Sequence, residues 1–402
     1  MKKTSAIALL IIACAIICGC MDQSETRVET TATEQDLRTL LKVPPHFALP
    51  PIPAYNIPTA AKIDLGRHLF YDKQLSGNGT QSCADCHLQS LAFSDGLKTP
   101  TGSTGQILAR NSQGLGNAAY HATLTWANNG FIDLEQQLQV PIRADNPIEL
   151  GVTETTIDDV LLRFNTSPLY IEKFDKAFPE ANNDINKNIN NGVSINQIIH
   201  ALASFCRTLT SGNSAYDDYL QGDKNALTEQ QKLGLQLFNG EKFECFHCHA
   251  GINFSSSYRD NNSQPATQTY PFFNNGLYNI SLNGSAGNYP AIDQGLFDLS
   301  QNPADKGLFR PQSLRNVALT APYMHDGSIA TLREVLEHYA RGGRKINAGP
   351  NTGDGKLNPY KSGFIQGFDA TPEELDAVEA FLESLTDYPL ITDPDLADPF
   401  EM

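Results

Sequence analysis

Two Cys-x-x-Cys-His motifs carry the side chains of this sequence that are best suited to chemistry. Their reactive residues are Cys83, Cys86 and His87 in the first motif and Cys245, Cys248 and His249 in the second. Two thiols at this spacing can form thioethers to both vinyl groups of a haem, and the adjacent histidine can then bind the iron. Zinc is the alternative, but it would need further cysteine or histidine ligands at a fitting spacing, and none is left over. The motifs therefore predict two covalently bound c-type haems.

The sixth ligand of each iron decides between an electron carrier and a catalyst. A carrier closes both iron sites with protein ligands, whereas a peroxidase leaves one site open. Beyond the N-terminal segment, methionine occurs only at Met21, Met324 and Met402, and only Met324 lies in a stretch that we expect to fold. Two methionine-ligated haems are therefore excluded, and even one depends on Met324.

Each motif follows a short stretch with helical periodicity. Residues 65–70 (Leu-Gly-Arg-His-Leu-Phe) precede the first motif, and residues 233–238 (Leu-Gly-Leu-Gln-Leu-Phe) precede the second. Apolar residues at i, i+3 and i+4 predict a helix in both places, with Thr228 as the N-cap of the second. Stretches rich in Gly, Asn, Ser and Pro separate the helices, and no run of alternating strands is evident. We therefore expect a mainly α fold with two cytochrome c-like domains, residues 41–215 and 216–402, each binding one haem within long ordered loops.

Length and charge limit the classes of function. The chain has 402 residues and a formal net charge of -16. This length suffices for two domains, and the acidic balance argues against a nucleic-acid partner, which would require a basic surface. Of the eight cysteines, four belong to the motifs and three lie near the N-terminus, so Cys206 in an apolar helical stretch is most simply a core residue.

The first residues resemble a secretion signal. Lys2 and Lys3 precede an apolar run from Ala6 to Ile17, which is too short to span a bilayer as a permanent helix. The run ends in Ile-Cys-Gly-Cys, which is similar to a bacterial lipoprotein cleavage box. We therefore expect a signal peptide over residues 1–19 and place the mature protein in the periplasm.

On this interpretation Cys20 becomes the first mature residue and carries a lipid anchor. Met21 after it favours the outer membrane over the inner one, and an ordinary cleaved signal is the alternative. Residues 20–40 are rich in Thr, Glu, Gln and Asp, so we expect a flexible tether there.

Six further segments carry a distinctive pattern. They are residues 82–87, 93–96, 110–111, 124–128, 146–151 and 314–328. With the haem motifs, they resemble the bacterial di-haem cytochrome c peroxidase and MauG superfamily, most closely its MbnH-type branch, from about Pro58 to Leu385. The resemblance implies an N-terminal peroxidatic haem, a C-terminal electron-transfer haem and a calcium ion between the domains.

The resemblance also implies the iron ligands. The family's ligand position for the C-terminal haem falls on Tyr339, and in MauG-like members it is also a tyrosine, whose phenolate can bind ferric haem. The alternative is that Tyr339 is packed in a helix and that Met324 or His338 is the ligand. The histidine that blocks the N-terminal haem in the peroxidases has no counterpart between residues 88 and 120, and His121 lies outside the family position. The first haem should therefore be five-coordinate and open.

The family's distal pocket corresponds to Gln137, Pro141 and Glu149. Glu149 can take a proton from bound hydrogen peroxide and return it to the leaving oxygen, while Gln137 holds the peroxide by hydrogen bonds. The alternatives are that Glu149 is a solvated loop acid and that Gln136 replaces Gln137. Trp126, the only tryptophan, matches the family residue that relays oxidising equivalents between the haems, although a lone tryptophan is usually a core residue.

Three residues match the calcium position of the family, namely Asn111, Thr320 and Pro322. Thr320 and Pro322 would bind through their backbone carbonyls, as suits a hard cation. The resemblance therefore predicts one calcium ion held by residues from both halves of the chain.

Three functions follow from these expectations. The first is a MauG-like or MbnH-like enzyme that uses hydrogen peroxide to reach a high-valent, bis-Fe(IV)-like state and oxidises a secreted protein, with a Trp of a copper-binding partner converted to kynurenine. The second is a cytochrome c peroxidase that reduces peroxide to water with electrons from a small cytochrome or a cupredoxin. The third is a passive electron-carrying lipoprotein, and the open first haem argues against it.

Overall fold

The structure is a computed structural model that describes residues 32–180, 192–263, 270–282 and 285–401. From Glu34 onward, the described residues form one compact unit. The predicted signal peptide over residues 1–19 and the lipid anchor on Cys20 lie outside the described residues. Within the described residues, no helix is long and apolar enough to cross a membrane.

The last part of the predicted tether is helical. Helix α1 spans Glu34–Leu40, and the Arg38 guanidinium donates a hydrogen bond to the carbonyl oxygen of Phe47 at 2.8 Å. Leu37 packs against a buried apolar cluster. The prediction of a flexible tether over residues 20–40 is therefore wrong at its C-terminal end. This end is ordered because its apolar side chain packs into a core, although the stretch is mostly polar.

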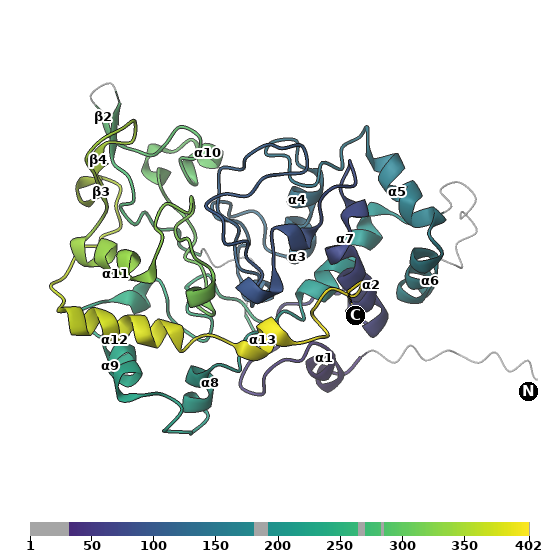
Figure 1. The fold of residues 1–402 in the computed structure, drawn as a ribbon, viewed down its shortest axis with the longest axis horizontal. Coiled ribbons are helices and arrows are strands. Elements are labelled where there is room, and N and C mark those ends of the chain that lie inside the picture. Colours follow the sequence, from purple (N-terminus) through teal and green to yellow (C-terminus); the bar gives the residue numbers. More distant parts are fainter. Residues whose placement is uncertain (1–31, 181–191, 264–269, 283–284, 402) are drawn as a thin grey trace, which may run out of the picture. The chain divides into compact units, whose positions relative to one another are not determined.

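Two long helices pack against each other in the N-terminal half (Figure 1). Helix α2 spans Ala60–Tyr71 and helix α7 spans Ile195–Cys206, and the side chain of each N-cap residue accepts a backbone hydrogen bond. Gly66 lets the two backbones touch, since a Cβ there would lie 2.0 Å from the carbonyl oxygen of Ala201. The first core cluster surrounds this contact and extends to the first haem motif.

The C-terminal half repeats this arrangement. Helix α9 spans Glu229–Phe238 and helix α12 spans Pro372–Glu383, and a Cβ on Gly234 would lie 1.9 Å from the carbonyl oxygen of Ala377. Thr228 caps α9, as predicted. The second core cluster surrounds this pair and extends to the second motif. The sequence repeat therefore corresponds to two helix pairs that are built in the same way.

Shorter helices and long loops make up the rest of the described chain. The other α-helices are α3 (Leu134–Gln137), α4 (Gln139–Arg143), α5 (Ile157–Thr166), α6 (Pro168–Ala177), α8 (Ala215–Leu220), α10 (Phe297–Ser300), α11 (Leu332–Arg341) and α13 (Tyr388–Thr392). The 3-10 helices are η1 (Lys73–Leu75), η2 (Cys83–Asp85), η3 (Gln89–Leu91), η4 (Ala118–Tyr120), η7 (Cys245–His247), η8 (Pro303–Asp305), η9 (Val317–Leu319) and η10 (Gly355–Leu357). The strands pair as β1 (Ile280–Leu282) with β2 (Ser285–Asn288) and β3 (Lys345–Ile346) with β4 (Gly353–Asp354), both antiparallel. The described chain is thus mainly helical, as predicted.

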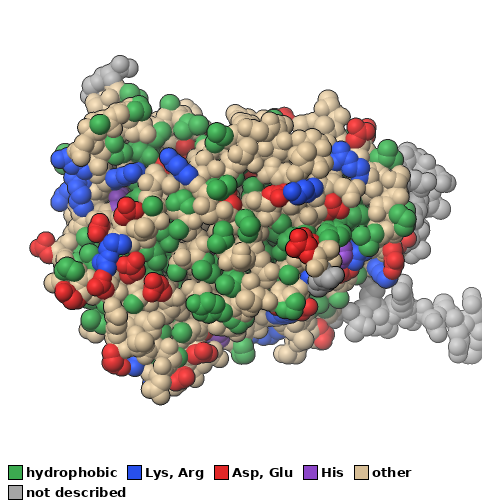
Figure 2. Space-filling model, in the orientation of Figure 1, with side chains coloured by type: hydrophobic (Ala, Val, Ile, Leu, Met, Phe, Trp, Pro, Cys, Tyr) green, Lys and Arg blue, Asp and Glu red, His purple; other side chains and the backbone are tan. Residues whose placement is uncertain are grey.

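Charged side chains mix on the surface over α11 and α12. On the face drawn in Figure 2, acidic and basic groups lie close together there, and Arg333 pairs with Asp376 and Glu379. This part of the surface therefore does not carry charge of a single sign, despite the acidic balance of the chain.

The C-terminal tail returns to the N-terminal half. Leu390 on α13 and Leu396 beyond it are buried in the first core cluster. Arg67 on α2 donates a hydrogen bond to a backbone carbonyl of the tail at 2.7 Å, and Figure 1 shows the tail running to α2. The division into domains 41–215 and 216–402 stays a prediction, and the tail crosses that boundary.

Candidate active site

The first motif lies on a 3-10 turn that presents its histidine. Asp85 Oδ2 accepts hydrogen bonds from the backbone N–H and the hydroxyl of Ser82 at 2.8 and 3.1 Å, which closes the turn. His87 Nδ1 lies 2.7 Å from the carbonyl oxygen of Phe93. Because a carbonyl oxygen only accepts hydrogen bonds, Nδ1 carries the proton, and Nε2 keeps the lone pair that a metal ion requires.

The second motif has the same geometry. His249 Nδ1 lies 3.0 Å from the carbonyl oxygen of Phe254. Phe93 and Phe254 both have left-handed backbone conformations, with φ of 61° and 47°, so the loop after each motif folds back in the same way. Burial lowers the pKa of His87 and of His249, which keeps both imidazoles neutral, the form that binds iron.

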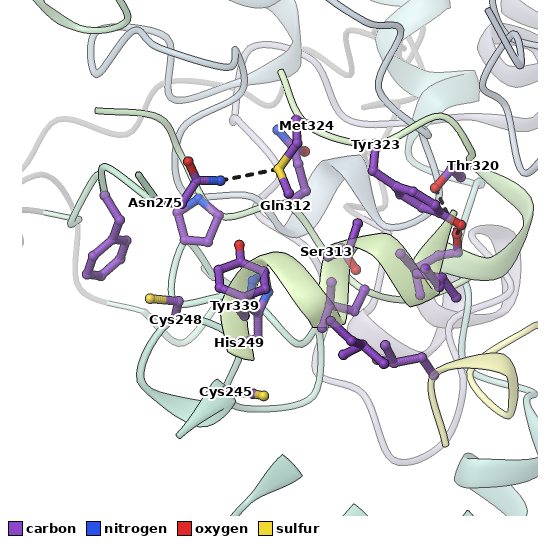
Figure 3. Close-up of a pocket in the computed structure, with 18 of the residues that line it drawn as sticks. Cys245, Cys248, His249, Asn275, Gln312, Ser313, Thr320, Tyr323, Met324 and Tyr339 are labelled. Atoms are coloured by element: carbon purple, nitrogen blue, oxygen red, sulfur yellow. Dashed lines mark hydrogen bonds between the residues drawn. The ribbon is translucent and has the colours of Figure 1, made fainter. Parts of the chain in front are cut away.

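A cavity of about 280 Å³ lies beside the second motif. Cys245, Cys248 and His249 line it, and Tyr339 projects into it from α11 (Figure 3). Burial raises the pKa of the Tyr339 hydroxyl to about 12. Two thiols, a neutral imidazole and a phenol around one cavity form a donor set that fits a haem c.

A buried arginine on the cavity wall also fits a haem. Arg310 is 2% exposed, and its guanidinium donates hydrogen bonds to neutral groups, among them Gln312 Oε1 at 2.9 Å and the carbonyl oxygen of Thr125 at 3.1 Å. Arg310 Nη1 and Gln312 Nε2 have no partner within the described chain, and burial lowers the pKa of Arg310 to about 9. A buried cation is stable beside an anion, and a haem brings two propionates.

Sequence reasoning missed Arg310 and Gln312. They lie four and two residues before the Leu314–Ser328 segment, but nothing in their spacing marks them. Their importance depends on burial and on what surrounds them, which the sequence does not show. Only their position next to a strongly patterned segment could have drawn attention to them.

The three alternatives for the second iron ligand are placed differently. His338 does not line the cavity, and its Nε2 lies 3.0 Å from the carbonyl oxygen of Asn275. Met324 does line the cavity, and its Sδ accepts a hydrogen bond from Asn275 Nδ2 at 3.2 Å (Figure 3). The Asn275 side chain also acts to lower the pKa of Tyr339, so it lies near that hydroxyl. The assignment of Tyr339 stays a prediction, with Met324 as its rival.

On the side of the first motif, Glu149 is a half-buried acid. Burial raises its pKa to about 7. Burial raises the pKa of the Cys83 and Cys86 thiols, and the charge of Glu149 adds a smaller contribution, which places Glu149 near the first motif. The Leu150 amide donates a hydrogen bond to the carbonyl oxygen of Pro141 at 2.9 Å, so Glu149 and Pro141 lie on adjoining segments. The raised pKa shows that the carboxyl is partly shielded from water, which disfavours the alternative of a solvated loop acid. The catalytic role of Glu149 stays a prediction.

The two neighbouring glutamines differ in their surroundings. Gln136 is exposed, and its Oε1 accepts a hydrogen bond from the Ile132 amide at 3.1 Å. Gln137 Oε1 is buried and has no partner among the residues described. A buried acceptor without a protein partner needs a ligand or a water molecule. This favours Gln137 over Gln136 as the residue that holds the peroxide.

Pro141 and Tyr339 lie at the same sequence distance from an N-cap residue, although Pro141 lies on the next helix, α4. Pro141 lies eight residues after the N-cap Asp133 of α3, and Tyr339 lies eight residues after the N-cap Thr331 of α11. A proline side chain offers no metal ligand, whereas a tyrosine side chain does. The correspondence therefore agrees with one open and one closed iron.

Trp126 joins the two halves at the cavity. Its Nε1 donates a hydrogen bond to the carbonyl oxygen of Asn111 at 2.9 Å, and the Asn111 amide donates to the carbonyl oxygen of His325 at 2.8 Å. Trp126 and Asn111 line the cavity together with Thr320 and Pro322. The three residues predicted to hold calcium thus border one cavity, and calcium binding stays a prediction.

His121 lies on the same cavity. It is buried, and its Nδ1 lies 3.3 Å from the carbonyl oxygen of Ser257. Burial holds its pKa well below the usual range. The ring is therefore a neutral imidazole in the interior, and nothing in its contacts assigns it to the first iron.

Two Cys-x-x-Cys-His turns with matching histidine geometry define a c-type cytochrome with two haem sites. Comparison with known proteins then gives the family. The family model of the di-haem cytochrome c peroxidases matches residues 60–225. The chain is 34% identical over 362 residues to the cytochrome-c peroxidase IdrP1 of Pseudomonas sp. (strain SCT), a match that covers 85% of this chain and 86% of that protein. The chain belongs to the di-haem cytochrome c peroxidase and MauG family, as the sequence predicted, and is a di-haem oxidoreductase.

Two further relatives lie on the MauG side of the family. The chain is 30% identical over 408 residues to the methylamine utilization protein MauG of Methylorubrum extorquens, a match that covers 98% of this chain and 100% of that protein. A crystal structure of a MauG-like protein associated with microbial copper homeostasis superposes with a TM-score of 0.83 at 43% identity. That match covers 89% of this chain and 98% of the other.

Proposed function

We propose that this protein uses hydrogen peroxide to oxidise a side chain of a partner protein. The observation that carries the proposal is the likeness to the MauG-like protein associated with copper homeostasis, at 43% identity over 98% of that chain. By this likeness, and by the resemblance to the MbnH-type branch, the substrate is a Trp of a secreted copper-binding protein, and the product is kynurenine.

The haems supply iron that exchanges electrons with peroxide. His87 and His249 would bind the two irons, and the adjacent thiols would hold the haems. Glu149 takes a proton from the peroxide and returns it to the leaving oxygen, because burial brings its pKa close to 7, where a carboxyl can do both. Gln137 donates or accepts a hydrogen bond at the same place, and Tyr339 would be the second protein ligand of the iron that His249 holds.

Further groups would connect the two halves of the protein and hold it at a membrane. Trp126 relays electrons between the halves, which its place on the shared cavity supports. A calcium ion on Asn111, Thr320 and Pro322 would fix the position of the two halves relative to each other at this cavity. A lipid anchor on Cys20 would keep the protein in the periplasm, on the outer membrane, close to a secreted partner.

Simple removal of peroxide is the second candidate. The relative IdrP1, at 34% identity over 86% of its length, is named a cytochrome-c peroxidase. In this case Gln137 and Glu149 keep their tasks, while a small cytochrome or a cupredoxin supplies the electrons. The two functions differ in where the electrons come from.

The deciding experiment mixes the diferric holoenzyme, at least two equivalents of hydrogen peroxide and the candidate copper-binding partner, and then measures the intact mass of the partner. Kynurenine formation takes two peroxides per Trp: two oxygen atoms are added, two water molecules form, and hydrolysis then releases one carbon as formate. The Trp residue thus gains one oxygen atom and loses one carbon atom. A partner with that Trp replaced by Phe is the control and should keep its mass. The enzyme should react without prior reduction, since residues 88–120 contain no histidine to block the first iron. An unmodified partner, together with rapid oxidation of reduced cytochrome c, would establish the peroxidase instead.

A further inference from the structure

A cluster of aromatic rings extends away from the cavity. His325 and Phe309 line the cavity, and their rings stack with centroids 3.8 Å apart. Tyr289 lies 6.0 Å from His325, and Tyr278 lies 5.4 Å from Tyr289 and 6.4 Å from His325, again between ring centroids. Trp126 packs against the same cluster. The rings therefore give a continuous path of contacts from the cavity to Tyr278.

Tyr278 and Tyr289 differ in the groups that accept their hydroxyl hydrogens. The Tyr278 hydroxyl donates to Asp326 Oδ2 at 2.5 Å, whereas the Tyr289 hydroxyl donates to Asn274 Oδ1 at 2.9 Å. A carboxylate can take up a proton, and an amide oxygen cannot do so near neutral pH. Because oxidation of a phenol releases its proton, a hydrogen-bonded base makes Tyr278 the more easily oxidised of the two.

A network of fixed groups holds Asp326 in this position. The Ser328 amide donates to Asp326 Oδ1 at 3.1 Å, and Arg344 Nη1 donates to Ser328 Oγ at 2.8 Å. The ring of Tyr278 is buried, while Asp326 is only partly buried. The carboxylate can therefore pass a proton on to solvent, although the ring itself is shielded from solvent.

We propose that Tyr278 is a redox-active residue that gives an electron toward the cavity and its proton to Asp326. This step rests on the peroxide reaction proposed above. The phenolic O–H bond breaks, the proton binds Asp326 Oδ2, and the electron passes by way of His325 and Phe309, which leaves a neutral tyrosyl radical. Each peroxide takes up two electrons and two protons and gives two water molecules. Tyr278 supplies one of these electrons, and the protein substrate or the cofactor supplies the other.

The test is electron paramagnetic resonance of holoenzyme that is frozen after mixing with stoichiometric peroxide in the absence of a partner protein. Wild type should show a tyrosyl radical whose hyperfine pattern changes when the protein is made with ring-deuterated tyrosine. Tyr278→Phe should lose this signal, and Asp326→Asn should weaken it strongly because the amide cannot take the proton. Tyr289→Phe keeps the ring in place and should keep the signal. A signal that survives in Tyr278→Phe would overturn the proposal.

Two further measurements keep the result decisive. A nitroso spin trap added to the wild type should leave a mass adduct on the peptide that contains Tyr278, so the proposal can be tested without any substitution. An adduct confined to other tyrosines would overturn it.

Peroxide consumption is followed in the same samples. If wild type consumes no peroxide, the proposed function fails, and hexachloroiridate(IV) then replaces peroxide as the one-electron oxidant. Failure of that oxidant to give a radical that depends on Tyr278 would end the proposal for Tyr278.

Discussion

Tyr339 and Met324 both line the cavity beside His249, and Asn275 lies close to both of them. The ligand of the second iron can therefore be assigned by removing each side chain in turn. Tyr339→Phe deletes the phenolic oxygen and keeps the ring, so we expect a changed visible and paramagnetic resonance spectrum of the ferric protein. Met324→Leu is the matched control and should leave the spectrum as it is. An unperturbed spectrum in Tyr339→Phe, or a near-infrared charge-transfer band typical of Met-ligated ferric haem, would assign the iron to Met324.

Glu149 gives the reaction with peroxide a pH dependence of known sign. Burial raises its pKa to about 7 from an ordinary 4.5, so the carboxyl is largely protonated at pH 6 and largely ionised at pH 8. Only the ionised form can take a proton from peroxide. The rate should therefore rise with pH through about 7, whereas an ordinary carboxyl would give a flat profile in this range.

Substitution tests this assignment. Glu149→Gln should slow the stopped-flow reaction with peroxide by about 10²–10⁴-fold, the usual contribution of a general base, and should remove the rise with pH. Glu154→Gln is a suitable control, since Glu154 is 85% exposed and pairs with Arg143 at the surface. A Glu149→Gln enzyme that keeps the wild-type pH profile would show that another group accepts the proton.

The two helix pairs depend on glycine at their contact. In most helices Gly→Ala is stabilising by about 1 kcal/mol. In Gly66→Ala the new Cβ would meet the carbonyl oxygen of Ala201, and in Gly234→Ala it would meet that of Ala377. We expect each substitution to destabilise the protein by about 1–3 kcal/mol, because the helices must separate. Thermal unfolding measures this, and Gly363→Ala, where a Cβ meets nothing within 4 Å, should leave the midpoint unchanged.

The elements were predictable where a local pattern fixes them. The Leu-Gly spacing before each motif and the cap at Thr228 predict α2 and α9, and the apolar stretch around Cys206 predicts α7. Helix α1 was missed because the polar composition of residues 20–40 outweighs the few leucines that pack into a core. The pairing of helices through Gly66 and Gly234 could not be predicted, since it depends on how close two backbones come.

The candidate site was predictable only in part, because it is assembled from segments far apart in the sequence. The resemblance named Trp126, Asn111 and Thr320, and the structure brings them to one cavity. The buried charge of Arg310 was not predictable, because its role depends on neighbours from the segment that contains Thr125, far away in the chain. Long-range contacts of this kind are set by packing, which a single sequence does not record.

At the scale of the whole molecule, the C-terminal tail ties the second half to the first core. Leu390 and Leu396 are 3% and 4% exposed among residues of the first cluster, and Arg67 on α2 donates a hydrogen bond to the tail. The chain should therefore unfold in one transition when followed at both haems. If the tail of the C-terminal half detaches, it exposes the core of the N-terminal half.

Substitution of Leu396 tests this coupling. Leu396→Ala removes buried apolar surface and should lower the free energy of unfolding by about 2–5 kcal/mol. The loss should be seen equally at the first and second haem in denaturant titrations followed by absorbance, although Leu396 contacts the N-terminal core. Tyr388→Ala, at a residue of the same tail that is 66% exposed, is the control and should change little. If Leu396→Ala shifts the midpoint at one haem and leaves the other in place, the halves unfold independently and the tail does not couple them.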